Sequence, residues 1–594
     1  MKKKKIIYLS ISIILALIAI IISFNLFTKN DKTLEGKPFS WDNVSLYFVM
    51  TDRFYDGDKS NNNSYGRVNV DSKGSTVGTF HGGDIKGLTK KLKEGYFDDL
   101  GINAIWLTSP VEQIHGFISG DSNGSFAHYG YHGYYALDWT SIDKNMGTAQ
   151  EMREFVDLAH SKGIRIVLDV VMNHTGFSTL KDMSDYEFSP LKNDTVDISN
   201  WTPSENENFD TYNKTIVDYS GHKEEWAKWW GTDWIRAGLP GYTPGGSNDI
   251  SMNLSGLPDI KTESTNPVDI PPILKTKWAK DITEKNDKWI IPAAEKYREN
   301  LNIAPSEYII KWLSSWVEEF GIDGFRCDTA KHIDMYRWQE LKEESNKALK
   351  TWREKNPDKP GAKWTDDFWM TGEVFGQGLD KNEYYNNGFD SIINFKFPKG
   401  DSLDSLEEIY SEYADKINSD PSFNVLSYIS SHDTGLTRGN MINLGTKLML
   451  APGGIEIYYG DESNRKPSTN TVTTAKDQPS RSDMNWDNVD KNVLSHWQKI
   501  GKFRSNHISV GAGEHKEIQT SPYTFSRFYN KNDFNDKVVV ATDVSNEATI
   551  DLSSVWEDST SIRDFYTGKK YTVKDGKVTV KADSNGVVLL EEVK

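Results

Sequence analysis

Short apolar segments alternate with amphipathic segments along most of this chain. From Trp41 onward, runs rich in Val, Ile, Leu and aromatic residues are separated by stretches in which apolar positions recur every three or four residues. This alternation is typical of repeated β–α units around a parallel sheet. Eight strands are predicted, at residues 45–50, 103–108, 163–171, 322–328, 368–374, 391–395, 424–431 and 454–459. Eight such units indicate an α/β fold, the (β/α)8 TIM barrel.

Helices are predicted between these strands, at residues 148–161, 305–320, 335–353, 402–417, 440–450 and 491–506. The barrel is thus predicted in two parts, residues 41–174 and 302–508, because strands 3 and 4 are much farther apart than any other pair. The residues between them, 175–301, are rich in Asn, Asp, Pro and Trp and predict an irregular inserted subdomain. Residues 509–594 carry short alternating segments, which predict a C-terminal all-β sandwich packed on the barrel.

The N-terminus carries a membrane-targeting pattern. Lys2–Lys5 precede Ile6–Phe27, an uncharged run of 22 residues that is long enough to span a bilayer. We expect residues 1–30 to stay as an anchor with the lysines inside, and residues 31–40 to form a polar tether. A cleaved signal peptide is the alternative, although no A-x-A-like cleavage site is evident. Either reading predicts an exported protein.

Composition narrows the classes of partner. Lys and Arg number 69 against 86 Asp and Glu, a net charge of −17, which opposes nucleic acid as the main partner. The single cysteine, Cys327, excludes an intrachain disulfide and a Cys-based zinc site. Because Cys327 lies between two polar residues of one strand, alternation predicts that it points into the core.

Charged residues gather where the predicted strands end. In TIM barrels catalysis takes place at this C-terminal face. Uncompensated carboxylates in one pocket repel and lose hydration, so their presence there favours a function over a packing role. Glycosidic bond cleavage needs such a pair, one carboxylate as nucleophile and one carboxylic acid that protonates the leaving oxygen. Arg326, two residues before Asp328 on the same strand face, is expected to keep that carboxylate ionised.

Four segments identify a resemblance. DVVMNH (169–174), GFRCDTAKH (324–332), GEVF (372–375) and SSHD (430–433) resemble the signature segments of the α-amylase family of glycoside hydrolases. LPDIK (257–261), YHGYY (131–135), TDRFYDGD (51–58), IYYGDES (457–463) and RSDMNW (481–486) are also similar to that family. The likeness runs from about Val44 to His507 and is greatest to exported bacterial members that act on maltodextrins.

The resemblance implies roles for individual residues. Asp328 would be the nucleophile, Glu373 the acid/base, and Asp433 the carboxylate that distorts and stabilises the bound sugar. The implied substrate-binding residues are His132, Tyr134, Asp169, His174, Arg326, Lys331, His332 and His432. Among these, Tyr134 would stack on the sugar at the cleavage point, whereas Lys331 and His332 would touch the glucose on the leaving side.

The resemblance also implies calcium as the cofactor. Asn173, Asp259 and the backbone carbonyl of His332 match the family's calcium site, and oxygen ligands suit this hard cation. The DGDKSNN loop crowds further oxygen ligands, Asp56, Asp58, Asn61 and Asn62. It is similar to an N-terminal calcium site of cyclodextrin-forming relatives, which Gly82 and Asp84 would complete. A plain Asx/Gly turn is the alternative for this loop.

The predicted function is endo-acting, retaining hydrolysis of α-1,4 bonds in starch or maltodextrin. A cyclodextrin-degrading enzyme, an α-glucosidase and a transglycosylase remain open, because Lys261 departs from many relatives in the insertion. A non-catalytic, membrane-anchored partner protein is the remaining alternative. The presence of all three catalytic carboxylates, Asp328, Glu373 and Asp433, argues against it. The sequence leaves the oligomeric state open.

Several aromatic residues allow two interpretations. Trp226, Trp229, Trp230 and Trp234 fit one helix face packed on the barrel, or an aromatic platform for glucose rings. His115, His128 and His222 lack a partner motif, which favours a structural or surface role for each.

Overall fold

Eight parallel strands close into a barrel in a computed structural model, which describes residues 38–121, 123–193, 195–198, 208–469, 478–531 and 533–593. They are β1 (Ser45–Val49), β2 (Ala104–Leu107), β7 (Arg165–Val170), β10 (Gly324–Cys327), β11 (Trp369–Gly372), β12 (Ser391–Asn394), β13 (Val425–Ser427) and β14 (Gly454–Tyr458). The strands follow chain order around the barrel, and β14 pairs with β1 to close it. All eight predicted strands are confirmed.

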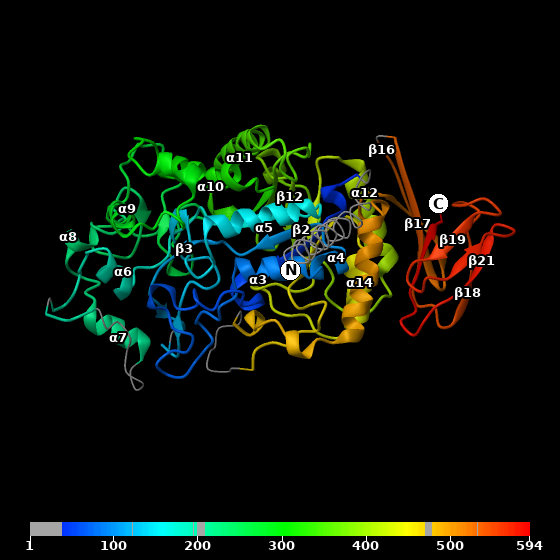
Figure 1. Cartoon of the computed structure of the whole chain (residues 1–594), viewed down its shortest axis with the longest axis horizontal. Coiled ribbons are helices and arrows are strands. Elements are labelled where there is room, and N and C mark those ends of the chain that lie inside the picture. Colours follow the sequence, from blue (N-terminus) through cyan, green and yellow to red (C-terminus); the bar gives the residue numbers. More distant parts are fainter. Residues whose placement is uncertain are drawn as a thin grey trace, which may run out of the picture. The chain divides into compact units, whose positions relative to one another are not determined.

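The helices follow the strands in the chain and lie around the barrel in Figure 1. The longer ones are α3 (Ile85–Lys93), α5 (Ala149–Ser161), α10 (Pro305–Phe320), α11 (Met335–Lys355), α12 (Leu406–Ser419), α13 (Met441–Met449) and α14 (Lys491–Asn506). The short ones are α2 (Thr51–Phe54), α4 (Tyr96–Asp99) and α15 (Ser509–Ala512). Helix α5 begins at a capping box formed by Thr148 and Glu151, and α10 ends at Gly321 with φ of 74°.

One predicted helix start was wrong. The helix predicted from Ser402 begins at Leu406, because Ser402 and Asp404 bond to each other in a local turn instead of joining the helix. The other five helices that were predicted between strands are present within two residues of their predicted bounds.

The insertion holds more regular structure than its composition indicated. It contains α6 (Leu180–Asp185), α7 (Phe209–Ile216), α8 (Lys223–Trp226), α9 (Pro272–Glu284), β8 (Ile235–Arg236) and β9 (Asp259–Ile260). The prediction of irregular structure was wrong at α9, which is 13 residues long. Its buried face includes the charged residues Lys277 and Asp281, so the periodic apolar pattern that predicts a helix is interrupted there.

The tryptophans with two interpretations, Trp226, Trp229, Trp230 and Trp234, are buried. Helix α8 ends at Trp226, so a single helix from Trp226 to Trp234 was the wrong geometry. All four side chains nevertheless belong to the core, and Trp234 stacks on Trp312 of α10 with ring centroids 5.8 Å apart. Packing between the insertion and the barrel is confirmed, and the sugar-platform alternative is excluded by this burial.

A second excursion from the barrel lies between β2 and β7. It contains β3 (Val111–Gln113), β4 (Ile118–Ser119), β5 (Ala127–His128) and β6 (Ala136–Ile142), and β3 pairs with β6 in an antiparallel ladder. His115 and His128 are buried here, and His222 lies at the insertion surface, which agrees with structural or surface roles. Cys327 is fully buried, as alternation predicted.

The C-terminal residues form two sheets. A six-stranded sheet is made of β15 (Glu514–Thr520), β16 (Tyr523–Lys531), β17 (Phe534–Ala541), β19 (Ser561–Asp564), β20 (Lys570–Thr572) and β22 (Val588–Glu592). The second sheet pairs β18 (Glu547–Asp551) with β21 (Lys577–Lys581). Val539, Ile550, Val580 and Leu590 belong to one buried cluster shared by the two sheets. This arrangement confirms the predicted all-β domain.

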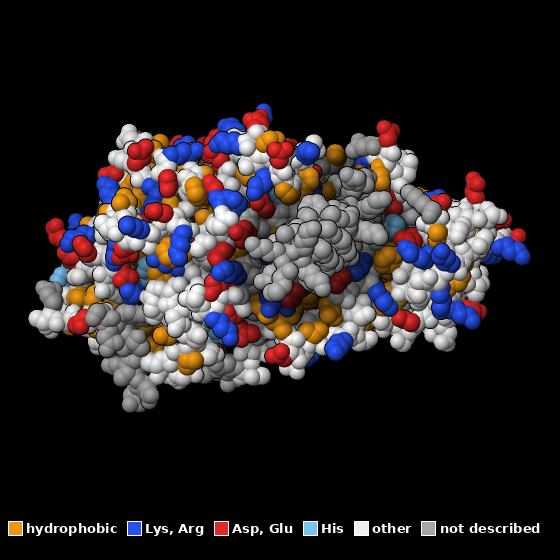
Figure 2. Space-filling view, viewed as in Figure 1, with side chains coloured by type: hydrophobic (Ala, Val, Ile, Leu, Met, Phe, Trp, Pro, Cys, Tyr) orange, Lys and Arg blue, Asp and Glu red, His pale blue; other side chains and the backbone are white. Residues whose placement is uncertain are grey.

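Residues 40–594 form one compact unit, in which the C-terminal domain contacts the barrel helices. The predicted anchor at residues 1–30 lies outside the described residues, as does most of the predicted tether. Within the described part of the chain, no helix is long and apolar enough to cross a membrane. Figure 2 shows acidic and basic side chains interspersed over the visible face, with no extended basic surface there.

Candidate active site

One buried arginine joins the acidic residues at the C-terminal end of the barrel. Arg326 lies on β10, next to Asp169 on β7 and opposite Thr371 on β11. Its Nη1 lies 2.9 Å from Asp169 and 2.8 Å from Asp328, and its Nη2 lies 3.1 Å from Glu373. Because one guanidinium contacts three carboxylates from three neighbouring strands, the barrel brings the predicted nucleophile and the predicted acid together.

Glu373 is set up to hold a proton. Burial raises its pKa to about 8; the nearby Arg326 opposes this rise, whereas Asp328 and Asp433 add to it. The Thr329 N–H donates at 2.9 Å to Glu373 Oε2, the same oxygen that Arg326 contacts. A carboxylic acid that stays protonated at neutral pH is what a leaving group requires from a general acid.

Asp433 has the opposite environment. Burial by itself would raise its pKa, but His432, Arg481 and Arg326 together hold the pKa below its ordinary value. Arg481 Nη2 lies 3.1 Å from Asp433 Oδ1, and His432 Nε2 lies 3.0 Å from Oδ2. Asp433 is therefore anionic at neutral pH, beside a protonated Glu373, so the two carboxyl groups can serve different roles.

Aromatic and imidazole rings form one wall of the site. Tyr134 lies between His132 and His432, with ring centroids 5.5 and 5.4 Å away and nearly parallel planes. Its hydroxyl donates to Asp169 Oδ2 at 2.7 Å, so Asp169 supports this wall from below, where it is itself buried. Trp106 Nε1 also donates to Asp169. The ring of Tyr134 is thus held in one orientation.

The histidines of this wall are neutral at physiological pH. Burial lowers the pKa of His132 and of His174, and it lowers the pKa of His432 to about 4. His132 Nδ1 accepts from the Tyr134 N–H at 3.1 Å, which places the ring proton on Nε2. That buried Nε2 has no partner among the described residues. A free N–H at this point can donate to a sugar hydroxyl.

Lys331 and His332 lie farther out. Lys331 is half exposed and forms an ion pair with Asp249 at 3.1 Å, while His332 Nδ1 lies 2.7 Å from the Asp249 carbonyl oxygen. Both contacts reach the insertion, so these residues border the site between the barrel and the insertion. Substrate contacts by either residue stay a prediction.

Two of the three residues predicted to hold the first calcium ion present unpaired side-chain oxygen atoms. Asn173 Oδ1 and Asp259 Oδ1 are both buried without a hydrogen-bond partner among the described residues. The backbone brings them together, because the Ile260 N–H donates to the Asn173 carbonyl at 2.8 Å and His174 forms a β-bridge with Asp259. Buried, unpaired oxygens cost free energy unless a donor or cation meets them, so this pair fits a hard cation.

Part of the DGDKSNN loop also presents buried side-chain oxygen atoms without hydrogen-bond partners. Asp56 Oδ1, Asn61 Oδ1 and Asn62 Oδ1 are buried without partners in the described structure. Asp58 instead pairs with Lys86, and Asp84 accepts from the N–H groups of Gly57, Asp58 and Gly87 as the N-cap of α3. Gly82, with φ of 95°, leaves the room that Asn62 occupies. No cluster of three or more His, Cys, Asp or Glu residues suited to a metal occurs within the described ranges.

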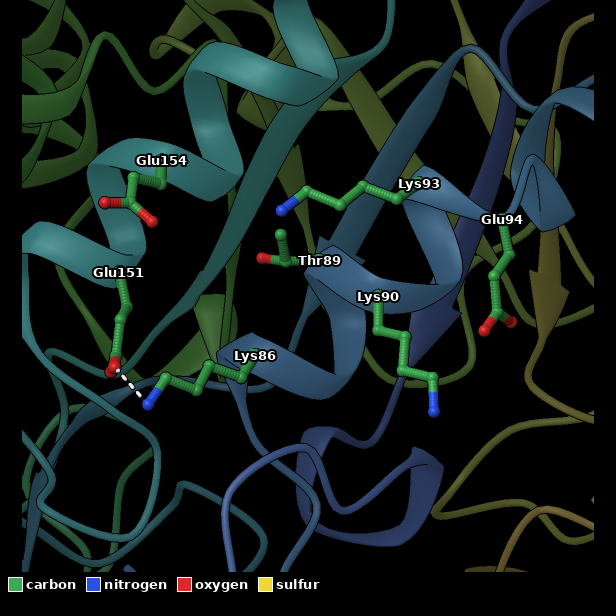
Figure 3. A pocket seen from close by; sticks show the side chains of 7 residues that line it. All are labelled: Lys86, Thr89, Lys90, Lys93, Glu94, Glu151 and Glu154. Carbon is green, nitrogen blue, oxygen red and sulfur yellow. Dashed lines mark ion pairs between the residues drawn. The ribbon is translucent and has the colours of Figure 1, made fainter. Parts of the chain in front are cut away.

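A surface pocket lies elsewhere, between α3 and α5. Its lining residues are Lys86, Thr89, Lys90, Lys93, Glu94, Glu151 and Glu154 (Figure 3). Lys86 Nζ lies 2.9 Å from Glu151 Oε1; the lysines of the lining lie on α3, whereas Glu151 and Glu154 lie on α5. Since these helices pack on the outside of the barrel, this pocket shares no residue with the acidic cluster.

Comparison with known proteins identifies this architecture. Residues 48–233 and 276–510 match the family described as "Alpha amylase, catalytic domain". The chain belongs to the α-amylase family. It is 43% identical to the periplasmic alpha-amylase of Escherichia coli (strain K12) over 528 residues, which cover 86% of this chain and 73% of that protein. The family resemblance predicted from the motifs is thereby confirmed.

More distant α-amylase relatives share the fold. A cyclomaltodextrin glucanotransferase from Geobacillus stearothermophilus is 24% identical over 91% of this chain, which spans 65% of that longer protein. A crystal structure of an Anoxybacillus alpha-amylase aligns with a TM-score of 0.57 at 21% identity, covering 94% of this chain and 100% of that chain. The alpha-amylase of Geobacillus thermoleovorans, solved with acarbose, aligns with a TM-score of 0.56 at 19% identity and the same coverage.

Two residues of this α-amylase site had no assigned role from the sequence. Arg481 contacts Asp433 and, through Nε, the carbonyl oxygen of His432 at 3.2 Å. Trp106 underlies Arg326, whose guanidinium carbon lies 5.3 Å from the ring centre. The RSDMNW segment was a visible signal for Arg481, but its distance of 48 residues from Asp433 hid the contact. Trp106 looked like an ordinary apolar residue of a strand.

Proposed function

We propose that this chain cleaves internal α-1,4-glucosidic bonds of starch or maltodextrin and retains the anomeric configuration. The observation that carries the proposal is the contact of Arg326 with Asp169, Asp328 and Glu373 at the C-terminal end of the barrel. It supports a pair of carboxyl groups, Asp328 and Glu373, at the ends of adjacent strands, and the raised pKa of Glu373 supports its role as the acid of a retaining glycosidase.

In this mechanism Asp328 attacks the anomeric carbon and forms a covalent glycosyl-enzyme. Glu373 donates its proton to the leaving glycosidic oxygen, then removes a proton from the water that hydrolyses the intermediate. Arg326 Nη1, 2.8 Å from Asp328 Oδ1, holds the nucleophile in position, and Asp433 accepts hydrogen bonds from sugar hydroxyls. Tyr134 would stack on the sugar at the cleavage point, with His132, His174 and His432 bonding its hydroxyls.

Calcium is part of the proposal as a structural ion. Asn173 Oδ1, Asp259 Oδ1 and the His332 carbonyl would hold it, which would cross-link the insertion to the barrel next to His174. A second ion would be held by Asp56, Asn61 and Asn62 in the DGDKSNN loop. The buried, unpaired oxygens support both sites. A bound ion would neutralise negative charge and hold the loops in place.

We also propose that the enzyme acts outside the cytoplasm. The basic and apolar pattern of residues 1–30, together with the periplasmic location named for the Escherichia coli relative, supports export. An uncleaved N-terminal anchor would keep the enzyme on the outer face of the cytoplasmic membrane.

A time-resolved product profile tests the proposed activity. Purified enzyme is incubated with soluble starch, maltoheptaose and a cyclodextrin, and the products are separated by chromatography. We expect an early fall in starch chain length with a mixture of short maltodextrins. Glucose as the sole early product would instead indicate an exo-acting α-glucosidase, and new cyclic or lengthened products would indicate a transglycosylase.

A further inference from the structure

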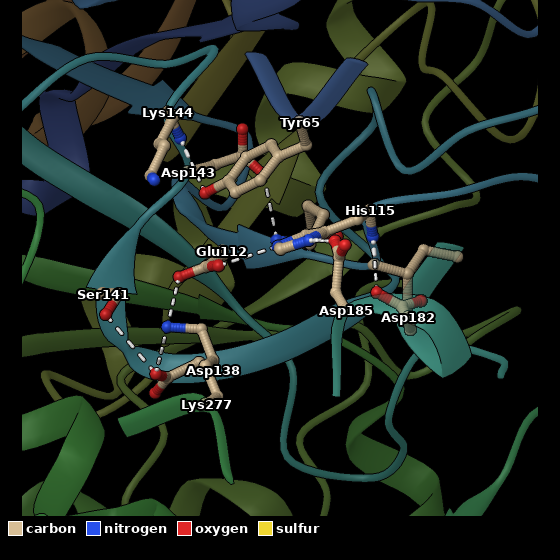
Figure 4. Close-up of polar contacts among 12 residues, drawn as sticks. Tyr65, Glu112, His115, Asp138, Ser141, Asp143, Lys144, Asp182, Asp185 and Lys277 are labelled. Atoms are coloured by element: carbon tan, nitrogen blue, oxygen red, sulfur yellow. Dashed lines mark hydrogen bonds and ion pairs between the residues drawn. The ribbon is translucent and has the colours of Figure 1, made fainter. Parts of the chain in front are cut away.

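A buried imidazole is held between two carboxylates, one on β3 and one on α6. His115 Nδ1 lies 3.0 Å from Asp185 Oδ2, and its Nε2 lies 2.9 Å from Glu112 Oε1 (Figure 4). Ionised carboxylates only accept hydrogen bonds, and a neutral imidazole has a single N–H. Both contacts are therefore satisfied only when the ring carries two protons and a positive charge.

The surroundings favour this charged form. The groups that face His115 are Glu112 on β3, Asp182 and Asp185 on α6, Tyr186 after it, Tyr65 stacked on the ring, and Lys277 on α9 behind Glu112. Lys277 is shared with Asp138 and Asp281, and Lys181 contacts Asp185 at 2.6 Å. Burial lowers the pKa of His115, but the bonds to Asp185 and Glu112 raise it above its ordinary value overall.

His115 and its two carboxylates, called the His115 clamp below, are connected through β3 to the wall of aromatic and imidazole rings that includes Tyr134. Gln113 Oε1 accepts from the Tyr135 N–H at 2.7 Å, and the Ile114 N–H donates to the Tyr135 carbonyl at 3.0 Å. Both residues lie between Glu112 and His115 in the chain. The peptide that follows Tyr134 is thus held from two sides by the segment that His115 fastens to α6.

We propose that the doubly protonated His115 is a positioning residue that fastens β3 to α6 and so keeps Tyr134 in place for the glucan. This inference rests on the proposed function. Clamping by a raised-pKa imidazole is complete below the ordinary pKa of about 6.5. It is lost as the pH rises through the raised folded-state pKa, where one carboxylate loses its donor. Glucan affinity therefore falls on the alkaline side.

The same chain contains a matched control. His507, just after α14, has Nδ1 2.8 Å from Asp536 and Nε2 2.7 Å from Glu591, so it forms a second clamp of the same chemistry. This clamp joins the barrel to β17 and β22 of the C-terminal domain. Losing it would affect stability in a similar way without changing the sugar-binding wall.

The test measures maltoheptaose binding to inactive Glu373→Gln enzyme by calorimetry from neutral to alkaline pH. The substitution removes the ionisation of Glu373, and His132, His174 and His432 are already neutral in this range. We expect affinity to fall by about tenfold. Adding His115→Gln should give weak binding at every pH with no alkaline fall, whereas adding His507→Gln should leave the alkaline fall unchanged.

An alkaline fall that persists in the His115→Gln variant would overturn the inference, as would its loss in the His507→Gln variant. If His115→Gln does not fold, Asp185→Asn replaces it. Weakening one of the two charged bonds to His115 should move the loss of maltoheptaose affinity to lower pH. A loss of affinity at the same pH as in the parent would contradict the inference. Failure of the Glu373→Gln parent to bind maltoheptaose at any pH would instead count against the proposed glucan specificity.

Discussion

Arg326 shows how a single residue separates the behaviour of three neighbouring carboxyl groups. Its two terminal nitrogens contact Asp169, Asp328 and Glu373, yet Glu373 keeps a pKa of about 8 because burial and two nearby anions outweigh the guanidinium. Asp433 has Arg481 and His432 on its own side and stays ionised. The surroundings of each carboxyl group, more than its residue type, decide which group keeps its proton and which stays ionised.

Substitution of the two central carboxyl groups tests these roles. Asp328→Asn should lose several orders of magnitude in kcat because no covalent intermediate can form. Glu373→Gln should lose roughly 100- to 10,000-fold, the usual contribution of general acid catalysis. Both variants should still bind maltodextrin. The first sugar released by wild-type enzyme should be the α anomer by NMR; a β anomer, or substantial activity in Asp328→Asn, would contradict the assignment.

The pH dependence of catalysis should follow Glu373. Because the acid must be protonated to act, kcat should be maximal below its pKa of about 8 and fall as the pH rises through that value. The measurement is kcat on maltoheptaose across the pH range, with stability checked at each pH. An enzyme whose kcat stays constant well above pH 8 would show that Glu373 is not the acid.

At the scale of elements, charged and aromatic residues attach the insertion to the barrel. Helix α9 places Lys277 and Asp281 in buried positions, where Lys277 meets Glu112 and Asp138 from the barrel side. The Trp234–Trp312 stack provides the apolar part of the same interface. Burying these charged side chains costs free energy unless oppositely charged partners meet them, and here another segment supplies the partners. The sequence of the helix alone does not show those partners.

Calcium should strengthen the junction at Asn173 and Asp259. A cation that binds only the folded state stabilises it by about 2.7 kcal/mol when its free concentration is 100 times Kd. Chelation should therefore lower the melting temperature, and Asp259→Ala should remove most of that sensitivity. Asp269→Ala, which changes an exposed aspartate of the same insertion, should respond to chelator like wild type. Equal stability of wild-type enzyme in excess chelator would contradict the site.

At the scale of the whole molecule, the barrel, the insertion and the C-terminal sheets form one unit. His507 joins α14 to two strands of the C-terminal domain, and the Ser509 hydroxyl donates to Asp536 at 2.7 Å. The C-terminal domain is thus fastened near the end of the last barrel helix. We expect it to support stability without contributing a catalytic group.

The N-terminal segment predicts where the whole enzyme resides. Each apolar residue at the centre of a spanning helix favours the bilayer by about 0.3–0.6 kcal/mol. Activity should therefore sediment with membranes, and deletion of residues 1–30 should move it to the soluble fraction with unchanged kcat. Mature protein in the medium that begins near Thr33 would show that the segment is a cleaved signal peptide.

Much of the fold and the central site could be predicted because their determinants are local in the chain. The barrel strands are short apolar runs; Asp328 and Glu373 each follow one directly, and Asp433 lies in the loop after β13. Helix α9, the ladder of β3 and β6, and the role of Arg481 could not be predicted in this way. Each depends on a partner far along the chain, such as Asp433 for Arg481.

By itself, the sequence determined the order of strands and helices, the family and the carboxyl groups at the strand ends, because hydrophobic periodicity and short motifs act over a few residues. Only the tertiary structure decided which of those groups keeps its proton, which oxygens remain unpaired for a cation, and which imidazole is held between two carboxylates. These properties depend on burial and on charges brought together from distant segments, so they arise only when the barrel closes and the insertion packs on it.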